Sequence, residues 1–502
     1  MKKNISRFIT LLVLLTFTAC SEDLFEEVQN KNNLNVDNWY QTANDFDMAL
    51  NSCYCALADG GLFGLQMQLL FGSFDDRIMF ETPGFDEFRI NSTSDNISSM
   101  WRALYFGVFR TSKFLERIYA KPEIEGMTDA RRNNVIAQAK ALRAMYYFYL
   151  VTIFNEPVFY NESSIPQDLL APQANGKPEQ FWDQLEKDLT EAIPDLTPKT
   201  SLDQADLGRV TRGAGNALLG KAMLYKHYYY YAKNGEKGSS GDIAALNTAK
   251  VAFKAIMDSK EYNLILPKAP KTRKDYIYAL LSNSSFLELP SENNVYPSEN
   301  NDESIWEVQY SDERFAAGWL PGWQWSGALN FAYFSGHLAS FKNQEVHPNL
   351  FFAAETAGAP AGFTRDPRIY ASCYLKDDTL DFRSENIAYF NKKFSGANSK
   401  KVAFVRKLTT PAESQWLGLK KYYFPVYNEL NAPKNDPFNR RVIRYADVLL
   451  MYAEVMHLLG DDGTGLNALN EVRARVDMPA IGALTKAAII HERDIELALE
   501  TL

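Results

Sequence analysis

The sequence contains few of the residues that metal and redox sites require. It has four cysteines and five histidines among 502 residues, and the histidines show no spacing typical of metal ligands. Cys53 and Cys55 form a C-x-C rather than a C-x-x-C redox motif, without a second ligand pair for zinc. We therefore predict no cofactor and no metal site. Two options stay open for these cysteines: Cys373 pairs with one of them, or all three are buried and unpaired, which we favour.

A basic surface is also missing. The chain has 62 acidic residues against 53 lysines and arginines, which gives a net charge of −9 at pH 7. Nucleic-acid-binding proteins need positive charge to neutralise phosphates, so we predict no nucleic-acid partner. The hydrophobic fraction of 46% is sufficient for a large core. No Pro/Gly/Ser-rich linker divides the chain, so we predict a single domain over residues 37–502.

Long apolar runs are absent except at the N-terminus. Residues 8–19 form an apolar stretch of 12 residues behind Lys2, Lys3 and Arg7. A membrane-spanning helix needs about 20 apolar residues, so this stretch fits a secretory signal peptide better than an anchor. We predict that residues 1–19 are the signal peptide.

Cys20 follows the small residues Thr18 and Ala19, an arrangement that resembles a bacterial lipobox with Phe17 in place of the usual Leu. We predict that Cys20 is lipidated; an ordinary cleaved signal followed by a chance cysteine is the alternative. Residues 20–36 would then be a flexible tether, and its acidic run resembles the export tag of surface lipoproteins in Bacteroidetes. The membrane contact would be the lipid anchor only.

Motifs of common enzyme classes are incomplete or missing. GNALLGKA at 215–222 lacks the Ser or Thr of a phosphate-binding loop and lies in an Ala/Leu-rich helical pattern, so helix packing explains it better. HERD at 491–494 lacks the second His of a zincin, and no G-x-S-x-G occurs. Carboxylates are abundant, so a glycosidase pair stays open, but nothing singles one out. We predict that the chain is not an enzyme.

Helical periodicity is the dominant pattern that is present. Alternating helices with Ala at close-packing positions resemble tetratricopeptide units, in which each helix pair buries its apolar face only by stacking on its neighbours. We predict a mostly α fold in which such helix pairs form a scaffold, mainly over residues 37–265 and 440–502. The predicted helices cover residues 100–120, 129–153, 178–193, 209–232, 242–259, 440–459, 464–476 and 484–500.

Residues 266–439 have a different composition, rich in Asn, Ser, Pro, Gly, Tyr and Trp. Only short strand-like pieces occur there, such as 303–310 and 420–427. We therefore predict a large loop-rich insert with few short strands, laid over the helical scaffold. Loops on a rigid scaffold often carry binding sites, so we expect this region to bind the ligand.

Aromatic residues gather within this insert. Trp319, Trp323 and Trp325 fall within a span of seven residues, inside a stretch that contains several Gly and Pro residues. Tyr333 follows closely. Flat rings stack on the apolar faces of sugars and lose little conformational entropy when held still. These four residues are candidate ligand contacts; packing of the tryptophans into the core is the alternative.

An earlier segment offers polar candidates. Asp75 and Arg77 lie in residues 71–96, which also carry several phenylalanines. A carboxylate and a guanidinium can hold sugar hydroxyls by charge-assisted hydrogen bonds. The alternative is a capping turn followed by a surface loop.

Several segments, taken in their order along the chain, resemble SusD/RagB-like outer-membrane nutrient-binding lipoproteins of Bacteroidetes. The resemblance covers nearly the whole chain after the signal, in the same order, although no single motif is diagnostic. It is carried by AQAKALRAMYYFYLVTIFNEPVFY (137–160), FWDQLEKDLTEAIPDL (181–196), GRVTRGAGNALLGKAMLY (208–225), NDESIWEVQYS (301–311), RDPRIYASCY (365–374), VIRYADVLLMYAEVMHLLG (442–460), LNEVRARVDMP (469–479) and HERDIELALE (491–500).

The resemblance implies a cell-surface, outer-membrane lipoprotein without enzymatic activity. Such proteins act as the lid of a SusC-like TonB-dependent transporter and deliver oligosaccharides, or in some cases peptides, to it. Their fold has four tetratricopeptide-like helix pairs under a loop-rich face. An early loop and the mid-chain insert hold the ligand, and the positions in comparable regions here are Asp75, Arg77, Trp319, Trp323, Trp325 and Tyr333.

Three other functions stay open: a peptide-binding lid of the same type, a helical-repeat scaffold lipoprotein and a surface glycoside hydrolase. The chain also departs from the family pattern at its end. Family members usually continue for several dozen residues beyond the position of Leu502. We therefore expect the last helix to lack a packing partner.

Overall fold

The computed structural model of the chain describes a helical scaffold and parts of the mid-chain region. The described residues are 39–64, 66–67, 70, 78–80, 91–92, 94–168, 171–234, 241–281, 299–310, 328–329, 344–346, 348–374, 379–381, 405–407, 418–419, 435–436 and 439–500.

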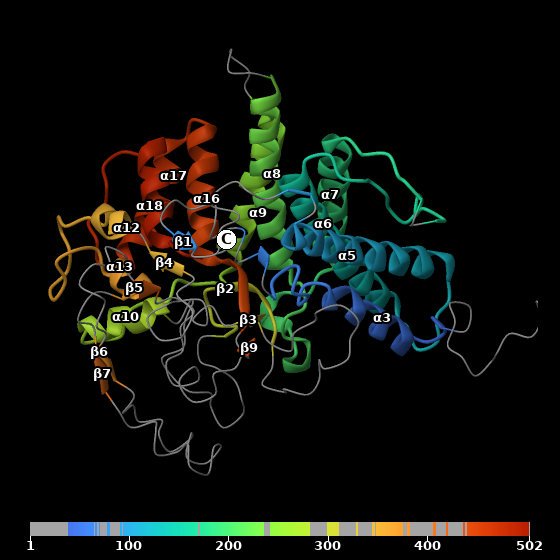
Figure 1. Cartoon of the computed structure of the whole chain (residues 1–502), viewed down its shortest axis with the longest axis horizontal. Coiled ribbons are helices and arrows are strands. Elements are labelled where there is room, and N and C mark those ends of the chain that lie inside the picture. Colours follow the sequence, from blue (N-terminus) through green and yellow to red (C-terminus); the bar gives the residue numbers. More distant parts are fainter. Residues whose placement is uncertain are drawn as a thin grey trace, which may run out of the picture.

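Helices dominate the described residues, which confirms the predicted fold class (Figure 1). Each predicted helix is present within a few residues of its expected bounds. The helices are α3 (Ala43–Cys55), α5 (Asp95–Ala120), α6 (Asp129–Phe154), α7 (Pro178–Ala192), α8 (Arg212–Asn234), α9 (Ile243–Ser259), α10 (Arg273–Leu281), α12 (Pro348–Ala353), α13 (Pro367–Ser372), α16 (Tyr445–Leu458), α17 (Asp462–Ala474) and α18 (Lys486–Glu496).

Consecutive helices pack side by side as the repeat pattern predicts. Helix α5 packs on α6, α6 on α7, α8 on α9, and α16 on α17. Helix α9 also contacts α16, although the long mid-chain region separates them in sequence. Figure 1 shows the result: α16, α17 and α18 stand beside α8 and α9, while α5, α6 and α7 lie on the other side of this pair.

Helix α6 occupies the centre of the N-terminal half. Residues 137–151 of this helix are buried except Lys140, because α3, α5 and α7 cover it on several sides. A helix that is apolar around its whole circumference is stable only when surrounded in this way. The Thr128 hydroxyl caps its first turn by accepting a hydrogen bond from the Arg131 amide.

Two glycines allow neighbouring helices to approach closely. A Cβ on Gly107 of α5 would lie 2.4 Å from the ring of Tyr146 on α6. A Cβ on Gly220 of α8 would lie 2.4 Å from the ring of Phe253 on α9. The segment 215–222, which contains Gly220, is thus a helix interior packed on its neighbour, which confirms helix packing over a phosphate loop.

The described strands are short and pair two by two, all antiparallel. The longest pair joins β2 (Ser304–Val308) and β10 (Arg440–Arg444), and both strands are fully buried. The other pairs are β1 (Ile78–Phe80) with β4 (Gln344–Val346), β3 (Ala328–Leu329) with β9 (Asn435–Asp436), β5 (Cys373–Tyr374) with β8 (Gly418–Leu419), and β6 (Thr379–Asp381) with β7 (Val405–Lys407).

The helix predicted from residue 440 begins instead at Tyr445, because residues 440–444 are strand β10. The run RRVIR joins directly to the apolar pattern of the helix, so periodicity alone gave no boundary. Pairing with β2 decides the conformation of residues 440–444. β2 itself confirms the strand predicted over residues 303–310.

A buried ion pair fixes α6 to α7. The Arg143 side chain is fully buried and donates two hydrogen bonds to the Asp188 carboxylate, at 2.7 and 2.8 Å. A further ion pair joins Arg143 to Glu162 in the loop between the two helices. A desolvated guanidinium is stable only when its donors are used in this way.

A second and larger set of buried charges joins the C-terminal helices to the mid-chain region. We call it the charge cluster; each of its side chains is at most 3% exposed. Its members lie on or close to α13, α17, α18, β2 and β10. They are Glu303, Asp366, Arg368, Arg444, Arg473, Arg475, Glu492, Glu496 and Glu500.

Helix α18 is therefore well packed, and the expectation that the last helix lacks a partner is wrong. It contacts α16 and α13, and Ile495 and Leu499 lie in one apolar cluster with Ile369. Glu496 at its end forms ion pairs with Arg444, at 2.6 Å, and with Arg475. Both apolar and ionic contacts thus hold the C-terminal segment in place.

We predict that replacing Arg143 with Met lowers the free energy of unfolding by about 3–5 kcal/mol, because Asp188 is left buried without its partner. Urea unfolding of residues 21–502, which include every described residue, measures this loss. The double variant R143M/D188L removes both charges and should recover most of the stability. If the double variant is no more stable than R143M, the unpaired carboxylate is not the cause.

We also predict that acid weakens the fold through the charge cluster. Burial opposes the charge of Glu496, but Arg475, Arg444 and Arg368 outweigh it and hold its pKa well below the usual range. A depressed carboxyl pKa contributes stability above the unfolded pKa of about 4.3 and loses it as pH falls toward the folded pKa. The free energy of unfolding should therefore be flat near neutral pH and fall below about pH 4.5.

Urea unfolding between pH 3 and pH 7 measures this dependence. The variant E496Q should be less stable at pH 7 and should lose less stability between pH 5 and pH 3 than the unchanged chain. An identical pH slope for both proteins would show that Glu496 does not contribute.

Candidate ligand-binding site

The residues that the sequence singles out for ligand binding lie outside the described residues. This holds for Asp75 and Arg77, for the tryptophans at 319, 323 and 325, for Tyr333, and for the lipidation site Cys20. Their roles stay predictions.

Short strands that border these residues in the sequence pair with one another. β1 begins at Ile78, directly after Arg77, and pairs with β4 in register Ile78 to Val346. The early segment and the mid-chain insert, which are far apart in sequence, thus meet at one antiparallel ladder. β3, between Trp325 and Tyr333, pairs with β9 near the end of the insert.

An exposed tryptophan lies on the scaffold itself. Trp101, near the start of α5, is 36% exposed and is the one exposed tryptophan among the described residues. Its ring centre lies 4.7 Å from that of Tyr105 and 5.0 Å from that of Phe154, at the end of α6. We call these three residues the aromatic platform.

The platform is held by contacts beneath it. The Tyr105 hydroxyl donates a hydrogen bond of 2.8 Å to the carbonyl of Val158, and its ring stacks on Tyr160. Burial raises the pKa of Tyr105, so the hydroxyl stays a neutral donor at physiological pH. Phe154 packs edge-on against Trp101, with an interplanar angle of 86°. The exposed Trp101 ring is thereby fixed before any ligand arrives.

A buried polar contact lies at the start of α5. Asn96, in the first turn, accepts a hydrogen bond of 3.2 Å from the side-chain amide of Gln66. The side-chain oxygen of Gln66 is buried and has no hydrogen-bond partner among the described residues.

Trp101 lies at helical spacing from Leu104 and Val108 in the sequence. In the structure the latter two are buried, whereas Trp101 is exposed.

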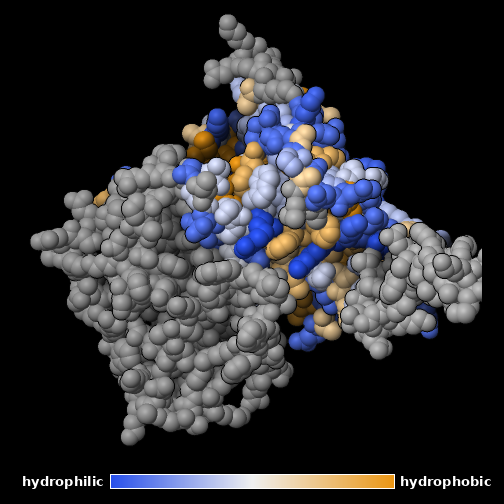
Figure 2. All heavy atoms as spheres, turned by 45° about the vertical axis from the view of Figure 1, so that its right-hand side comes forward, coloured by the Kyte–Doolittle hydropathy of each residue, from blue (hydrophilic) through white to orange (hydrophobic). Residues whose placement is uncertain are grey.

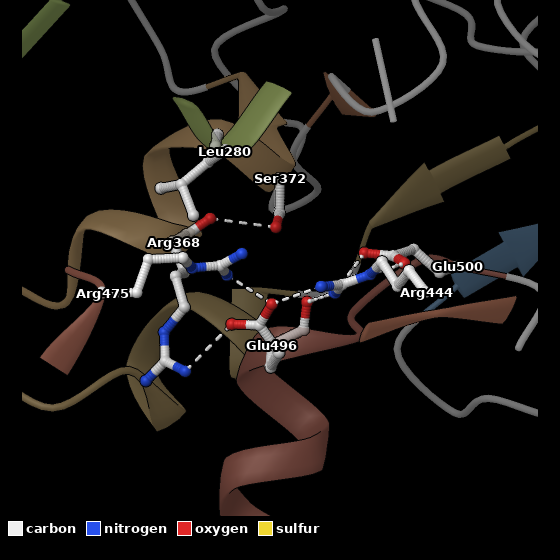
Figure 3. A pocket seen from close by; sticks show the side chains of 8 residues that line it. Leu280, Arg368, Ser372, Arg444, Arg475, Glu496 and Glu500 are labelled. Atoms are coloured by element: carbon white, nitrogen blue, oxygen red, sulfur yellow. Dashed lines mark hydrogen bonds and ion pairs between the residues drawn. The ribbon is translucent and has the colours of Figure 1, made fainter. Parts of the chain in front are cut away.

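The pocket that the structure describes lies inside the charge cluster (Figure 3). Leu280, Ala371 and Ser372 line it together with charged residues of the cluster, and Glu496 points toward Arg444 and Arg475. The space open to the centre of a water molecule is about 10 Å³, so the pocket has room for about one water. The charged side chains that line this pocket pair with one another and stabilise the fold. The pocket itself is too small for a sugar.

The acidic side chains, histidines and cysteines of the described residues form neither a metal cluster nor a disulfide. No group of three or more His, Cys, Asp or Glu side chains in these parts of the chain could hold a metal ion. Cys53, Cys55 and Cys373 form no disulfide, so the pairing option is wrong. Cys55 is exposed, contrary to expectation, because it lies two residues after the buried Cys53 and thus on the opposite side of α3.

Within the described part of the chain, no helix has both the length and the apolar character needed to cross a bilayer. Figure 2 shows one face, on which hydrophilic residues predominate in the coloured part and hydrophobic residues form separate patches.

Comparison with known proteins agrees with this architecture. A SusD-like protein of Bacteroides ovatus is 22% identical, over 98% of this chain and 80% of its own length. A solved SusD-like protein of Bacteroides fragilis has a TM-score of 0.67 at 18% identity, over 93% of this chain and 86% of that chain. A solved laminarin-binding SusD-like protein has a TM-score of 0.62 at 23% identity, over 92% and 90%. These solved structures show the fold.

Family models match two parts of the chain. A model described as "Starch-binding associating with outer membrane" matches residues 80–224. The model of the SusD family matches residues 221–501, which is more than half of the chain. The chain therefore belongs to the SusD family.

Proposed function

We propose that this protein is a cell-surface lipoprotein that binds oligosaccharides and passes them to a SusC-like TonB-dependent transporter in the outer membrane. The aromatic platform of Trp101, Tyr105 and Phe154 is the observation that carries the glycan-binding part. Family membership and the laminarin-binding relative of the same fold support it. The signal peptide and Cys20 support a lipid-anchored position.

The platform suits a sugar for a physical reason. One face of a pyranose ring carries C–H groups, which pack on a flat aromatic ring and thereby lose their contact with water. The hydroxyl groups stay at the edge of the sugar ring, where they can form hydrogen bonds. A ring that is already fixed by Tyr105 and Phe154 loses little conformational entropy when the sugar stacks on it. Hydrogen-bonding side chains around the platform then select among sugars.

The ladder of β1 and β4 supports a shared site for the other candidates. It pairs Ile78, the residue after Arg77, with Val346 of the insert to which Tyr333 and the tryptophans at 319, 323 and 325 belong in the sequence. We propose that side chains of both segments contact the same ligand, with the rings stacking on sugar faces and Asp75 and Arg77 binding hydroxyl groups. The protein then acts by capture and release, without a catalytic step.

The transporter part of the proposal rests on the family and on the anchor. A lipid tether keeps the binding face within a fixed distance of a partner in the same membrane, which raises their effective concentration. The helical scaffold, which stays rigid, would hold the transporter, and the loop-rich region would hold the sugar.

We predict that W101A binds its oligosaccharide about ten-fold more weakly than the unchanged chain, because it removes the exposed ring. Calorimetry of residues 21–502 against a panel of oligosaccharides and peptides measures this. The variant F106A is the matched control, since Phe106 is equally exposed (38%) on the same helix but is not part of the platform. Its affinity should be unchanged.

Three outcomes would contradict the proposal in different ways. Binding of peptides but no oligosaccharide would favour a peptide-binding lid. Hydrolysis of a bound oligosaccharide would favour a surface glycoside hydrolase. If a protein that unfolds cooperatively binds none of the oligosaccharides and peptides in the panel, a scaffold lipoprotein is favoured.

A further inference from the structure

Two arginines of the mid-chain region have no acidic partner among the described residues. Arg273, exposed at the start of α10, stacks on the ring of Tyr370, with 4.6 Å between its guanidinium carbon and the ring centre. The same guanidinium lies 5.5 Å from the ring centre of Phe363. No carboxylate among the described residues lies within ion-pair distance of Arg273.

Arg365 repeats this arrangement nearby. Its guanidinium lies 4.9 Å from the ring centre of Phe351 and 5.7 Å from that of Phe352. Its Nη1 donates a hydrogen bond of 2.9 Å to the carbonyl of Ala354, which uses part of its donor capacity. It too has no described carboxylate within ion-pair distance.

The rings beneath the two arginines form one continuous aromatic cluster. Tyr370 lies 5.3 Å from Phe363 and 6.2 Å from Phe351, ring centre to ring centre. Phe352 at its edge is 64% exposed. We call Arg273, Arg365 and these four rings the guanidinium patch.

Nearby carboxylates among the described residues have other partners. Asp275 accepts hydrogen bonds of 2.6 Å from the Thr272 amide and hydroxyl. Asp366 and Glu355 pair with Arg368 and Arg473, respectively, at 2.6 and 2.8 Å. Within the described part of the chain, the patch thus carries positive charge without an ion-pair partner, although the chain as a whole has a net charge of −9. A general excess of basic residues does not account for it.

Stacking on a ring leaves the edge of a guanidinium available. The face of the group is covered by the ring, while its N–H donors point outward in the plane. Two parallel N–H groups match the two oxygens of a carboxylate or sulfate, and low local hydration makes such charge-assisted hydrogen bonds stronger. An exposed ring such as Phe352 beside them can take the apolar face of a sugar.

We propose that the guanidinium patch binds an anionic oxygen group carried by a glycan, either the carboxylate of a uronic acid or a sulfate ester. The proposal rests on the proposed glycan-binding function, because it assigns a charge to the bound sugar. It places a second contact region on α10, α12 and α13, apart from the aromatic platform on α5 and α6.

The test compares three probes by calorimetry on residues 21–502: a neutral laminari-oligosaccharide, an oligogalacturonate and a sulfated carrageenan oligosaccharide. We expect at least one anionic probe to bind more tightly than the neutral one, with an affinity that falls as salt rises from 0.05 to 0.5 M. The double variant R273Q/R365Q should lose about ten-fold or more in affinity for that probe and none for a neutral probe. Whichever anionic probe binds identifies the source of the oxygen group.

Two further variants separate site from bulk charge. K113Q/R212Q removes the same charge from α5 and α8 and should leave the affinity for every probe unchanged. R273K keeps the charge but loses the planar fork, so it should retain part of the affinity. Thermal unfolding of each variant confirms that the fold is intact.

The outcomes distinguish this inference from the function on which it rests. Binding of neutral glycans, with no preference for anionic probes and no effect of R273Q/R365Q on any probe, overturns the inference and leaves the proposed function standing. Equal losses in R273Q/R365Q and K113Q/R212Q also overturn it, because bulk charge then explains the effect. Failure to bind any glycan overturns both.

Discussion

The constraint on which this structure depends is that none of its helices can bury its apolar face alone. Each is covered by the next, from α3 through α5, α6 and α7 to α8 and α9, and α16 closes the series against α9. Because α16 arrives only after the long mid-chain region, the chain must return to the scaffold at a fixed place. The chain between α9 and α16 thus starts and ends on packed helices of the scaffold, which suits a ligand-binding surface built from loops.

Buried charges fix the position at which the chain packs again on the scaffold after the mid-chain region. Apolar contacts tolerate sliding, whereas a desolvated guanidinium tolerates only a geometry that satisfies its donors. Arg143 and Asp188 fix α6 to α7, and Arg444 and Glu496 fix β10 to the end of α18. Arg368 ties α13 of the mid-chain region to the same acidic groups. The mid-chain region is thus joined to the scaffold by ionic contacts, which we expect to make the fold sensitive to acid.

The scaffold was predictable from the sequence, and the binding surfaces largely were not. Helices such as α6 and α9 follow from 3.6-residue periodicity, which depends only on local spacing. Strand β10 did not, because its conformation depends on pairing with β2, far away in sequence. The contact of Trp101 with Phe154 joins α5 to the end of α6, and the stacking of Arg273 on Tyr370 joins α10 to α13. Such features belong to tertiary contacts that one sequence does not encode locally.

The central claim is that an oligosaccharide rests on an aromatic surface fixed by this scaffold. A crystal structure of residues 21–502 with the tightest-binding oligosaccharide tests it most directly. The account predicts a sugar ring stacked on Trp101, with the helices α5 and α6 unchanged beneath it. A sugar bound elsewhere, with the Trp101 ring covered by protein or left in solvent, would contradict it.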